Sequence, residues 1–235
     1  MPNQSPSTQP TQQSTARSFR AWTWLLGTVI FGVVTDLVTK SLAFAKVAEF
    51  PVHIERSHVL AESNLGNLIP YHQPVIAIPK LLEFTLVLNP GAVFGIGAGQ
   101  RWFFVIFTLF AMLVATVLFI KWTKPRDWIA HAGFGLIIAG GIGNLYDRLL
   151  FGCVRDFIHP LPGMKLPFGI TWPGGASNEV WPYVSNVADL YLLIGIALLL
   201  IYTWKQPVPI TTDNADPKTT ANKDSTPTES VPNDG

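Results

Sequence analysis

Apolar residues along this chain gather into four long runs that are separated by polar segments. The runs cover residues 21–44, 102–122, 128–151 and 184–204. Each reaches the roughly 20 residues that an α-helix needs to cross a hydrocarbon core of about 30 Å. Tryptophans stand near the ends of the runs, as is typical of helices whose ends lie at the headgroup level. The pattern predicts an all-α membrane protein with four transmembrane helices.

The segments outside the runs predict the rest of the organisation. Residues 1–20 and 206–235 belong to tails rich in Pro, Thr, Ser, Asn and Asp, a composition that cannot bury enough apolar surface to fold. We therefore expect two disordered tails around one domain, residues 21–205. Between the first two runs, the stretches HVLAE (58–62) and KLLEFTLVLN (80–89) predict short extended segments of a small β-like region, and a loop follows the third run.

Basic residues set the expected orientation. They flank the first run, fill the link between the second and third, and follow the fourth: Arg17, Arg20, Lys121, Lys124, Arg126 and Lys205. The excess of Lys and Arg in cytoplasmic loops places both termini in the cytoplasm. Residues 45–101 and 152–183 then lie outside.

Composition narrows the classes of function. The chain is 49% hydrophobic and 13% charged, with a formal net charge of +1. A chain this apolar and nearly neutral lacks the basic surface that binds nucleic acid. Neither a Cys/His cluster nor a phosphate-binding glycine loop occurs, so we expect no metal and no cofactor. Cys153, the single cysteine, is interpreted as a small apolar filler.

Polar residues recur at one depth of the predicted spans. They stand late in the first and third runs, which run outward, early in the fourth, which runs inward, and just before the second: Asp36, Lys40, Asn144, Asp147, Arg148, Asn186, Asp189 and Asn89. A charge in hydrocarbon costs about 2.5 to 3.5 kcal/mol on insertion scales. Four segments that place such groups at the outer leaflet indicate one shared site.

Some of these groups have a nearby partner of opposite charge. Asp36 and Lys40 are four residues apart and share a helix face. Asp147 and Arg148 are neighbours in the chain. One interpretation is therefore structural: each pair satisfies itself and joins helices.

Two acids have no such partner. Asp156 follows the third run, and its neighbour Arg155 points away because adjacent residues do so in helices and strands alike. Asp189 has no base within a helical turn. Two carboxylates held close together share a proton, so that one can act as base on a water while the other donates a proton. The pattern indicates a carboxylate pair.

Two other classes of function remain open at this point. A small transporter or proton-coupled carrier also places acids inside a membrane. Its polar groups would form a path through both leaflets, whereas these cluster on one side. A binding or scaffold protein without chemistry would leave Asp156 unexplained.

The motifs around these residues resemble those of a known family. DLVTK (36–40), NPGAVFGI (89–96), GGIGNLYDRLLFGCVRDF (140–157) and SNVADLYLLIG (185–195) follow the order of the bacterial lipoprotein signal peptidases, the type II signal peptidases. The resemblance covers about residues 20–205. It implies a multi-pass intramembrane aspartic endopeptidase of the bacterial inner membrane, acting as a monomer near the outer leaflet. It also implies the partners: membrane lipid and prolipoproteins, which are cut before a cysteine that carries diacylglycerol.

The resemblance assigns roles by motif position. Asp156 and Asp189 match the catalytic pair. The remaining matches line or brace the site: Asp36, Lys40, Asn89, Gly91, Phe94, Asn144, Asp147, Arg148 and Asn186. One departure is the outer segment 159–183, which is longer than we expect for the family. Its Pro, Gly and Trp content predicts an ordered loop over the active site that acts as a lid.

Overall fold

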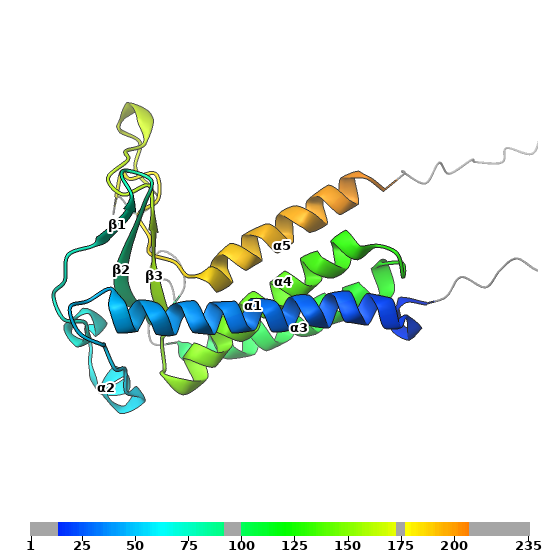
Figure 1. The fold of residues 1–235 in the computed structure, drawn as a ribbon, viewed down its shortest axis with the longest axis horizontal. Coiled ribbons are helices and arrows are strands. Elements are labelled where there is room, and N and C mark those ends of the chain that lie inside the picture. Colours follow the sequence, from blue (N-terminus) through cyan, green and yellow to red (C-terminus); the bar gives the residue numbers. More distant parts are fainter. Residues whose placement is uncertain (1–13, 92–99, 173–176, 207–235) are drawn as a thin grey trace, which may run out of the picture. The chain divides into compact units, whose positions relative to one another are not determined.

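The computed structural model describes residues 14–91, 100–172 and 177–206, and Figure 1 shows their fold. Within these residues, four helices are long and apolar enough to cross a membrane: α1 (Phe19–Lys46), α3 (Arg101–Trp122), α4 (Trp128–Leu150) and α5 (Val187–Trp204). The predicted four-helix membrane fold with a small β segment is confirmed. The chain forms one compact unit through Lys205, and of the segment from Gln206 onward only Gln206 is described.

Helix α4 packs against all three other spans and is the most buried of them. Its glycines allow this close approach. A Cβ at Gly140 would come within 2.5 Å of the Ala188 carbonyl oxygen, and one at Gly143 within 2.2 Å of Asp36 Oδ2. Small residues at such contacts let helix backbones approach closely in a membrane, where apolar burial provides no driving force. The glycines thereby bring polar groups of α1 and α5 next to α4.

A three-stranded antiparallel sheet lies across one end of the helices (Figure 1). In the described residues its order is β1 (Val75–Ile78), β2 (Leu82–Asn89) and β3 (Val154–Pro160). Short helices precede it: α2 (Arg56–Ala61) and the 3-10 turn η2 (Leu65–Leu68). The extended segment predicted for residues 58–62 is therefore wrong.

The two faces of the sheet differ. Leu86 and Leu88 of β2 pack with Phe157 and with Phe44 of α1 in a hydrophobic cluster. Side chains alternate along a strand, so Val87 and Asn89 face the other side. In the register of the sheet, Val87 pairs with Asp156.

The structure shifts the ends of two spans relative to the sequence prediction. Helix α1 begins at Phe19 because Ser18 caps it, accepting a hydrogen bond from Ala21 N. Residues Thr15–Arg17, assigned above to the tail, form the 3-10 turn η1, and Thr15 Oγ1 donates to the Thr123 carbonyl. Helix α5 begins at Val187, three residues later than predicted, because Asn186 is its N-cap.

The outer segment after β3 is predicted from the sequence to be an ordered loop over the active site. Its described residues form a hairpin: Leu166 N donates to Asn178 O and Val180 N to Met164 O, both at 2.7 Å. The 3-10 turn η4 (Pro167–Gly169) forms part of its tip. The hairpin continues from the end of β3 that is remote from Asp156 (Figure 1), because seven residues of strand carry the chain away from the helices. The described part of the hairpin therefore extends away from the helices, and its role as a lid over the carboxylates stays a prediction.

Candidate active site

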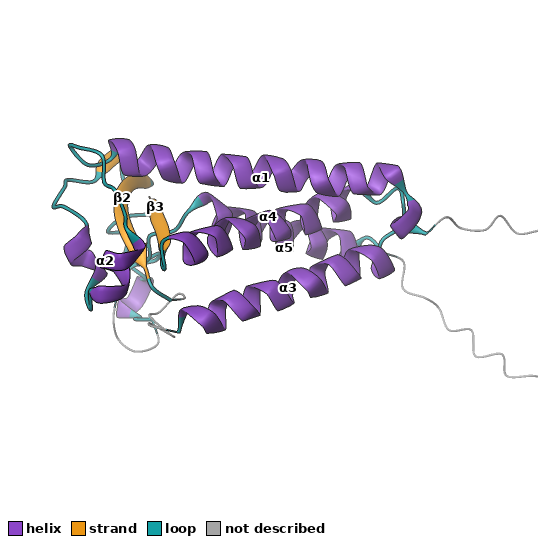
Figure 2. Cartoon of the chain, turned by 90° about the horizontal axis from the view of Figure 1, so that it is seen from below, coloured by secondary structure: helices purple, strands orange, loops and turns teal. Residues whose placement is uncertain are grey.

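The polar residues singled out in the sequence meet where the helices end and the sheet begins. Figure 2 shows β2 and β3 beside the ends of α1, α4 and α5. The chain leaves α4 through Gly152, whose φ of +87° is readily adopted only by glycine. It then enters β3, which pairs with β2 so that Asp156 lies opposite Val87 and within hydrogen-bonding reach of the Asn89 side chain.

Asp156 lies on β3 with only 1% of its surface exposed. Both oxygens of its carboxyl group accept a hydrogen bond from an amide side chain. Asn186 Nδ2 donates to Oδ1 at 2.6 Å and Asn89 Nδ2 donates to Oδ2 at 3.0 Å. The carboxyl is therefore held from two sides, by the N-cap of α5 and the end of β2.

Asp189 lies in the first turn of α5, and its carboxylate is also fixed through both oxygens. Asn144 Nδ2 donates to Oδ1 at 2.8 Å, and the backbone N–H of Asn186 donates to Oδ2 at 3.2 Å. Asn186 Oδ1 accepts from Asp189 N in return, which completes a capping box. The helix start thus fixes Asp189.

Asn186 joins the two carboxyl groups. Its side chain donates to Asp156, its backbone donates to Asp189, and its Nδ2 also lies 3.1 Å from Asn144 Oδ1. Asn144 in turn accepts from Lys40 Nζ at 3.1 Å. The chain of contacts therefore runs from the carboxyl pair into the charged residues of α1.

The environment of Asp156 favours the protonated acid. Burial, and then the negative charge of Asp189, raise the pKa of Asp156 to about 7, against the hydrogen bonds from Asn186 and Asn89, which stabilise the carboxylate. One acid with a raised pKa beside a second carboxylate is the arrangement that lets a pair divide the roles of proton donor and proton acceptor.

Four charged side chains beneath the pair form a neutral cluster. Lys40 Nζ lies 2.9 Å from Asp36 Oδ2 and 3.3 Å from Asp147 Oδ2, and all three side chains are fully buried. Arg155 supplies the second positive charge. Asp36 Oδ1 also accepts from Ala188 N at 2.9 Å, which ties α1 to the first turn of α5. The predicted pairing of Asp36 with Lys40 is confirmed.

The predicted pairing of Asp147 with Arg148 is wrong. Arg155 Nη2 donates to Asp147 Oδ1 at 2.9 Å, and Arg155 N donates to Oδ2 at 3.0 Å. Consecutive residues of a helix point about 100° apart, so Asp147 and Arg148 cannot face each other. Arg155 was missed because it lies beyond the turn after α4. One signal in the sequence could have identified it. Adjacent residues of a strand point to opposite faces, so Arg155 must face away from Asp156.

Arg148 instead connects the carboxyl pair to the segment after β2. Its Nη2 donates to the Gly91 carbonyl at 3.1 Å, and its guanidinium lies 5.1 Å from the centre of the Phe104 ring. Its charge also interacts with Asp189 and Asp156. Phe94, predicted for the same segment, lies outside the described residues.

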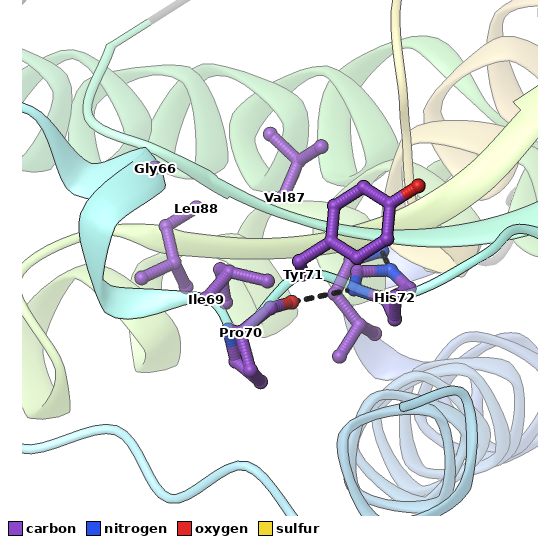
Figure 3. Close-up of a pocket in the computed structure, with 8 residues that line it drawn as sticks. Gly66, Ile69, Pro70, Tyr71, His72, Val87 and Leu88 are labelled. Carbon is purple, nitrogen blue, oxygen red and sulfur yellow. Dashed lines mark hydrogen bonds between the residues drawn. The ribbon is translucent and has the colours of Figure 1, made fainter. Parts of the chain in front are cut away.

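Two further features lie close to the site. Cys153 is buried, and burial raises the pKa of its thiol to about 12, as expected for an inert filler. A cavity of about 230 Å³ lies on the other side of β2 from β3, lined by residues that include Tyr71 and His72 (Figure 3). His72 Nε2 accepts from Leu86 N at 3.0 Å, which fixes this wall of the cavity to the strand.

Comparisons with known proteins agree on one family. The family model described as signal peptidase (SPase) II matches residues 28–205. A lipoprotein signal peptidase of Desulfitobacterium hafniense is 33% identical over 137 residues, which cover 58% of this chain and 77% of that protein. One from Streptococcus agalactiae is 36% identical over 129 residues, 55% of this chain and 72% of the relative.

A solved structure matches most of the fold. It is a bacterial membrane enzyme determined by the in meso method at 1.9 Å, with a TM-score of 0.53 and 25% sequence identity. The match covers 84% of this chain and 100% of that one. It supports a multi-pass membrane protein with four apolar helices.

The first prediction distinguishes the two arginines by double-mutant cycles. We expect Arg155→Met to destabilise the protein by about 3 to 5 kcal/mol, because it removes one partner of a buried ion pair. Combining it with Asp147→Asn should show a coupling energy of roughly 1 to 3 kcal/mol. The matched cycle of Asp147→Asn with Arg148→Met should show much less. Unfolding in detergent measures both coupling energies, and equal values in the two cycles would contradict the geometry.

The second prediction concerns stability and pH. The raised pKa of Asp156 means that the folded protein keeps a proton that the unfolded chain loses near pH 3.8. The retained proton contributes to the free energy of unfolding. This contribution is present in full below pH 3.8 and is lost as pH rises through about 7, and the total loss is on the order of 4 kcal/mol. The unfolding temperature should therefore fall with rising pH across this window. The fall should be smaller in Asp156→Asn, and an identical pH dependence in both proteins would refute the assignment.

Proposed function

This chain belongs to the signal peptidase II family, whose members are lipoprotein signal peptidases, and from that premise we propose that it is an intramembrane aspartic endopeptidase. Asp156 and Asp189 are the catalytic pair. The observation that carries the proposal is the fixation of all four of their carboxyl oxygens by amide donors at the end of the spans. Family membership also favours a peptidase over the carrier and scaffold alternatives.

In the proposed reaction a water molecule is held between the two carboxyl groups. Asp189 accepts a proton from this water, and the oxygen of the water forms a bond to the scissile carbonyl carbon. Asp156, protonated because of its raised pKa, gives its proton to the carbonyl oxygen. The C–N bond of the tetrahedral intermediate then breaks, and the proton on Asp189 passes to the leaving nitrogen. As the carbonyl group forms again, a hydroxyl proton of the intermediate returns to Asp156. The products are the free signal peptide and a lipoprotein with a free N-terminal amine.

Charge balance supports this division of roles. With Asp156 protonated, the remaining negative charge of Asp189 is matched by the positive charge of Arg148. The cluster beneath is balanced separately, since Asp36 and Asp147 face Lys40 and Arg155. A site that is neutral in each part avoids an isolated charge near hydrocarbon, which is costly.

The placement of the pair suits a substrate that arrives within the bilayer. A signal-peptide helix would approach from the lipid beside the spans, and its cleavage region would unwind at the end of the helices where the sheet begins. The substrate is a prolipoprotein cut immediately before a cysteine bearing diacylglycerol, whose acyl chains would stay in the adjacent leaflet. Both termini of the enzyme lie in the cytoplasm, and the cut occurs near the outer leaflet. One chain supplies every group named, so a monomer suffices.

The amides and the charged cluster position the pair. Asn186 and Asn144 orient the carboxyl groups directly. Asp36 acts at a distance, by holding the first turn of α5 through Ala188 N. Preorganised contacts of this kind contribute to catalysis because they need no rearrangement during the reaction.

The third prediction is that Asp156→Asn and Asp189→Asn each abolish cleavage of a diacylglyceryl prolipoprotein. An amide can neither accept the water proton nor donate one to the carbonyl. Asp127→Asn is the matched control, because this acid accepts hydrogen bonds from Tyr202 and Lys124 at the far end of the spans. It should keep wild-type turnover. Release of the signal peptide by purified protein in detergent measures this, with unfolding temperature as the check on folding.

Two outcomes would contradict the aspartic mechanism. One is near-normal turnover in either variant of the catalytic pair. The other is inactivation of the wild-type protein by a chelator that is reversed by added zinc, since the proposed chemistry requires proton transfer between two carboxyl groups only.

The fourth prediction is a decline of activity on the alkaline side. Asp156 must carry a proton to begin the reaction, and its pKa is about 7. The turnover number should therefore fall as pH rises above about 7, by roughly tenfold for each further pH unit in the simplest case. A turnover number that stays constant up to pH 9 would assign the proton donor to another group.

A further inference from the structure

The hairpin after β3 has a fixed base. We define the outer hairpin as residues 161–172 and 177–180. Next to its base, His159 Nδ1 lies 2.8 Å from Glu83 Oε1 on β2, and Trp172 Nε1 donates to the Glu179 carbonyl at 2.8 Å. Together with the backbone bonds between its two arms, these contacts connect the hairpin to the sheet as an ordered extension of β3.

The tip of the outer hairpin presents apolar side chains outward. Phe168 is 98% exposed, Ile170 56% and Met164 44%. Phe168 also adopts a left-handed backbone conformation, with φ of 60° and ψ of 20°. This conformation is unfavourable for a bulky residue, and glycine would adopt it at lower cost. A phenylalanine held out in this way indicates that its ring has a contact outside the chain.

The charge of this segment suits a lipid surface. The charged residues of the outer hairpin are Lys165 and Glu179, which are paired across its two arms, and residues 166–178 between them contain no charged residue. Lys165 is exposed and lies next to Met164 and Leu166 at the tip. Apolar side chains with a neighbouring lysine are typical of segments that lie in the headgroup region, where the ammonium group meets lipid phosphates.

The sheet begins where the hydrocarbon ends. On α1 the large apolar side chains that remain exposed extend from Phe19 to Leu42. At 1.5 Å per residue this stretch of helix rises about 35 Å, enough to cross a hydrocarbon core of roughly 30 Å. Only two residues past Leu42, Phe44 packs into the hydrophobic cluster of the sheet with Leu88 and Phe157. The strands therefore lie at headgroup depth.

The direction of the hairpin takes its tip away from the protein. In Figure 1 the strands cross the direction of the helix axes, and the hairpin continues past β1 and beyond the start of α5. On α5 the exposed apolar positions begin at Leu190, five residues after Ser185, which pairs with Ile158 of β3. A tip at this depth and beside the spans would meet lipid.

We propose that the outer hairpin is a membrane anchor whose tip inserts into the boundary between headgroups and acyl chains. Phe168, Ile170 and Met164 enter the apolar side of this boundary, and Lys165 lies at the phosphates. The occupant of the apolar tip is thus the bilayer that the four helices span. Anchoring holds the sheet, and with it the strand that carries Asp156, parallel to the membrane surface. The inference does not depend on the catalytic proposal.

Spin labels test the depth of the tip. A Cys153→Ser background removes the buried thiol, and single cysteines then replace Phe168, Ile170 or Thr171. Ile170 is extended, so Thr171 points to the opposite side and serves as the matched control. Leu193 of α5, which is 54% exposed, marks the hydrocarbon. The full chain is placed in single-copy nanodiscs of phosphatidylcholine and phosphatidylglycerol, and collision of each nitroxide with oxygen and with a water-soluble nickel chelate is measured by power saturation.

The expected result is a clear split between the two sides. Labels at Phe168 and Ile170 should collide several-fold less with the nickel chelate than the label at Thr171, and more with oxygen, approaching the label at Leu193. Phe168→Ser should lower the protection at Ile170, whereas the control Met112→Leu inside the helices should not. A thermal unfolding transition in detergent that matches that of the Cys153→Ser protein confirms that each labelled protein is folded.

Three outcomes would overturn the proposal. In the first, Phe168 and Thr171 are equally accessible to the nickel chelate, so the tip is in water. In the second, Phe168 becomes protected only after a prolipoprotein is added, which assigns the tip to substrate. In the third, protection is absent in single-copy nanodiscs and appears with dipolar broadening at high protein density, which assigns it to a second copy of the chain.

Discussion

Burial of charge at the end of an apolar helix bundle is the constraint on which this structure depends. Asp36, Lys40 and Asp147 are fully buried, and Asp156 is nearly so. Leaving any of them without a partner would cost several kcal/mol, so each must meet a group from another segment. The glycines of α4 make this possible by letting α1 and α5 approach its backbone. The same close helix contacts therefore provide both the packing of the spans and the partners of the buried charges.

The same constraint connects stability to catalysis. The neutral cluster of Lys40, Arg155 and the two acids beneath the site holds α1, α4 and β3 together. The amides of Asn144 and Asn186 transmit this order to the carboxyl pair. Because these amides are uncharged, they fix the carboxyl groups without neutralising them, and in the proposed mechanism the proton on Asp156 stays available for transfer.

The sheet extends the functional unit beyond the membrane spans. Strand β3 carries Asp156, β2 supplies Asn89, and the opposite face of both strands packs on Phe44 of α1. A strand that begins directly after α4 therefore has two tasks, since it completes the carboxyl pair at one end and leads into the outer hairpin at the other. An anchor at that far end would restrain the orientation of the strand on the membrane.

The sequence by itself determined the features that depend on the length of an apolar run or on the spacing of residues within one helix. Run length against bilayer thickness gave the four spans, and helical spacing gave the pairing of Asp36 with Lys40. The motif order pointed to the family that the comparisons then showed. Only the tertiary structure decided which groups meet across segments. Asp147 binds Arg155 instead of Arg148 because the turn at Gly152 redirects the chain from α4 into β3, and a turn of this kind leaves no periodic signal. Likewise, the hairpin points away from Asp156 because the register of β3 on β2, set by packing of the sheet on α1, fixes its direction.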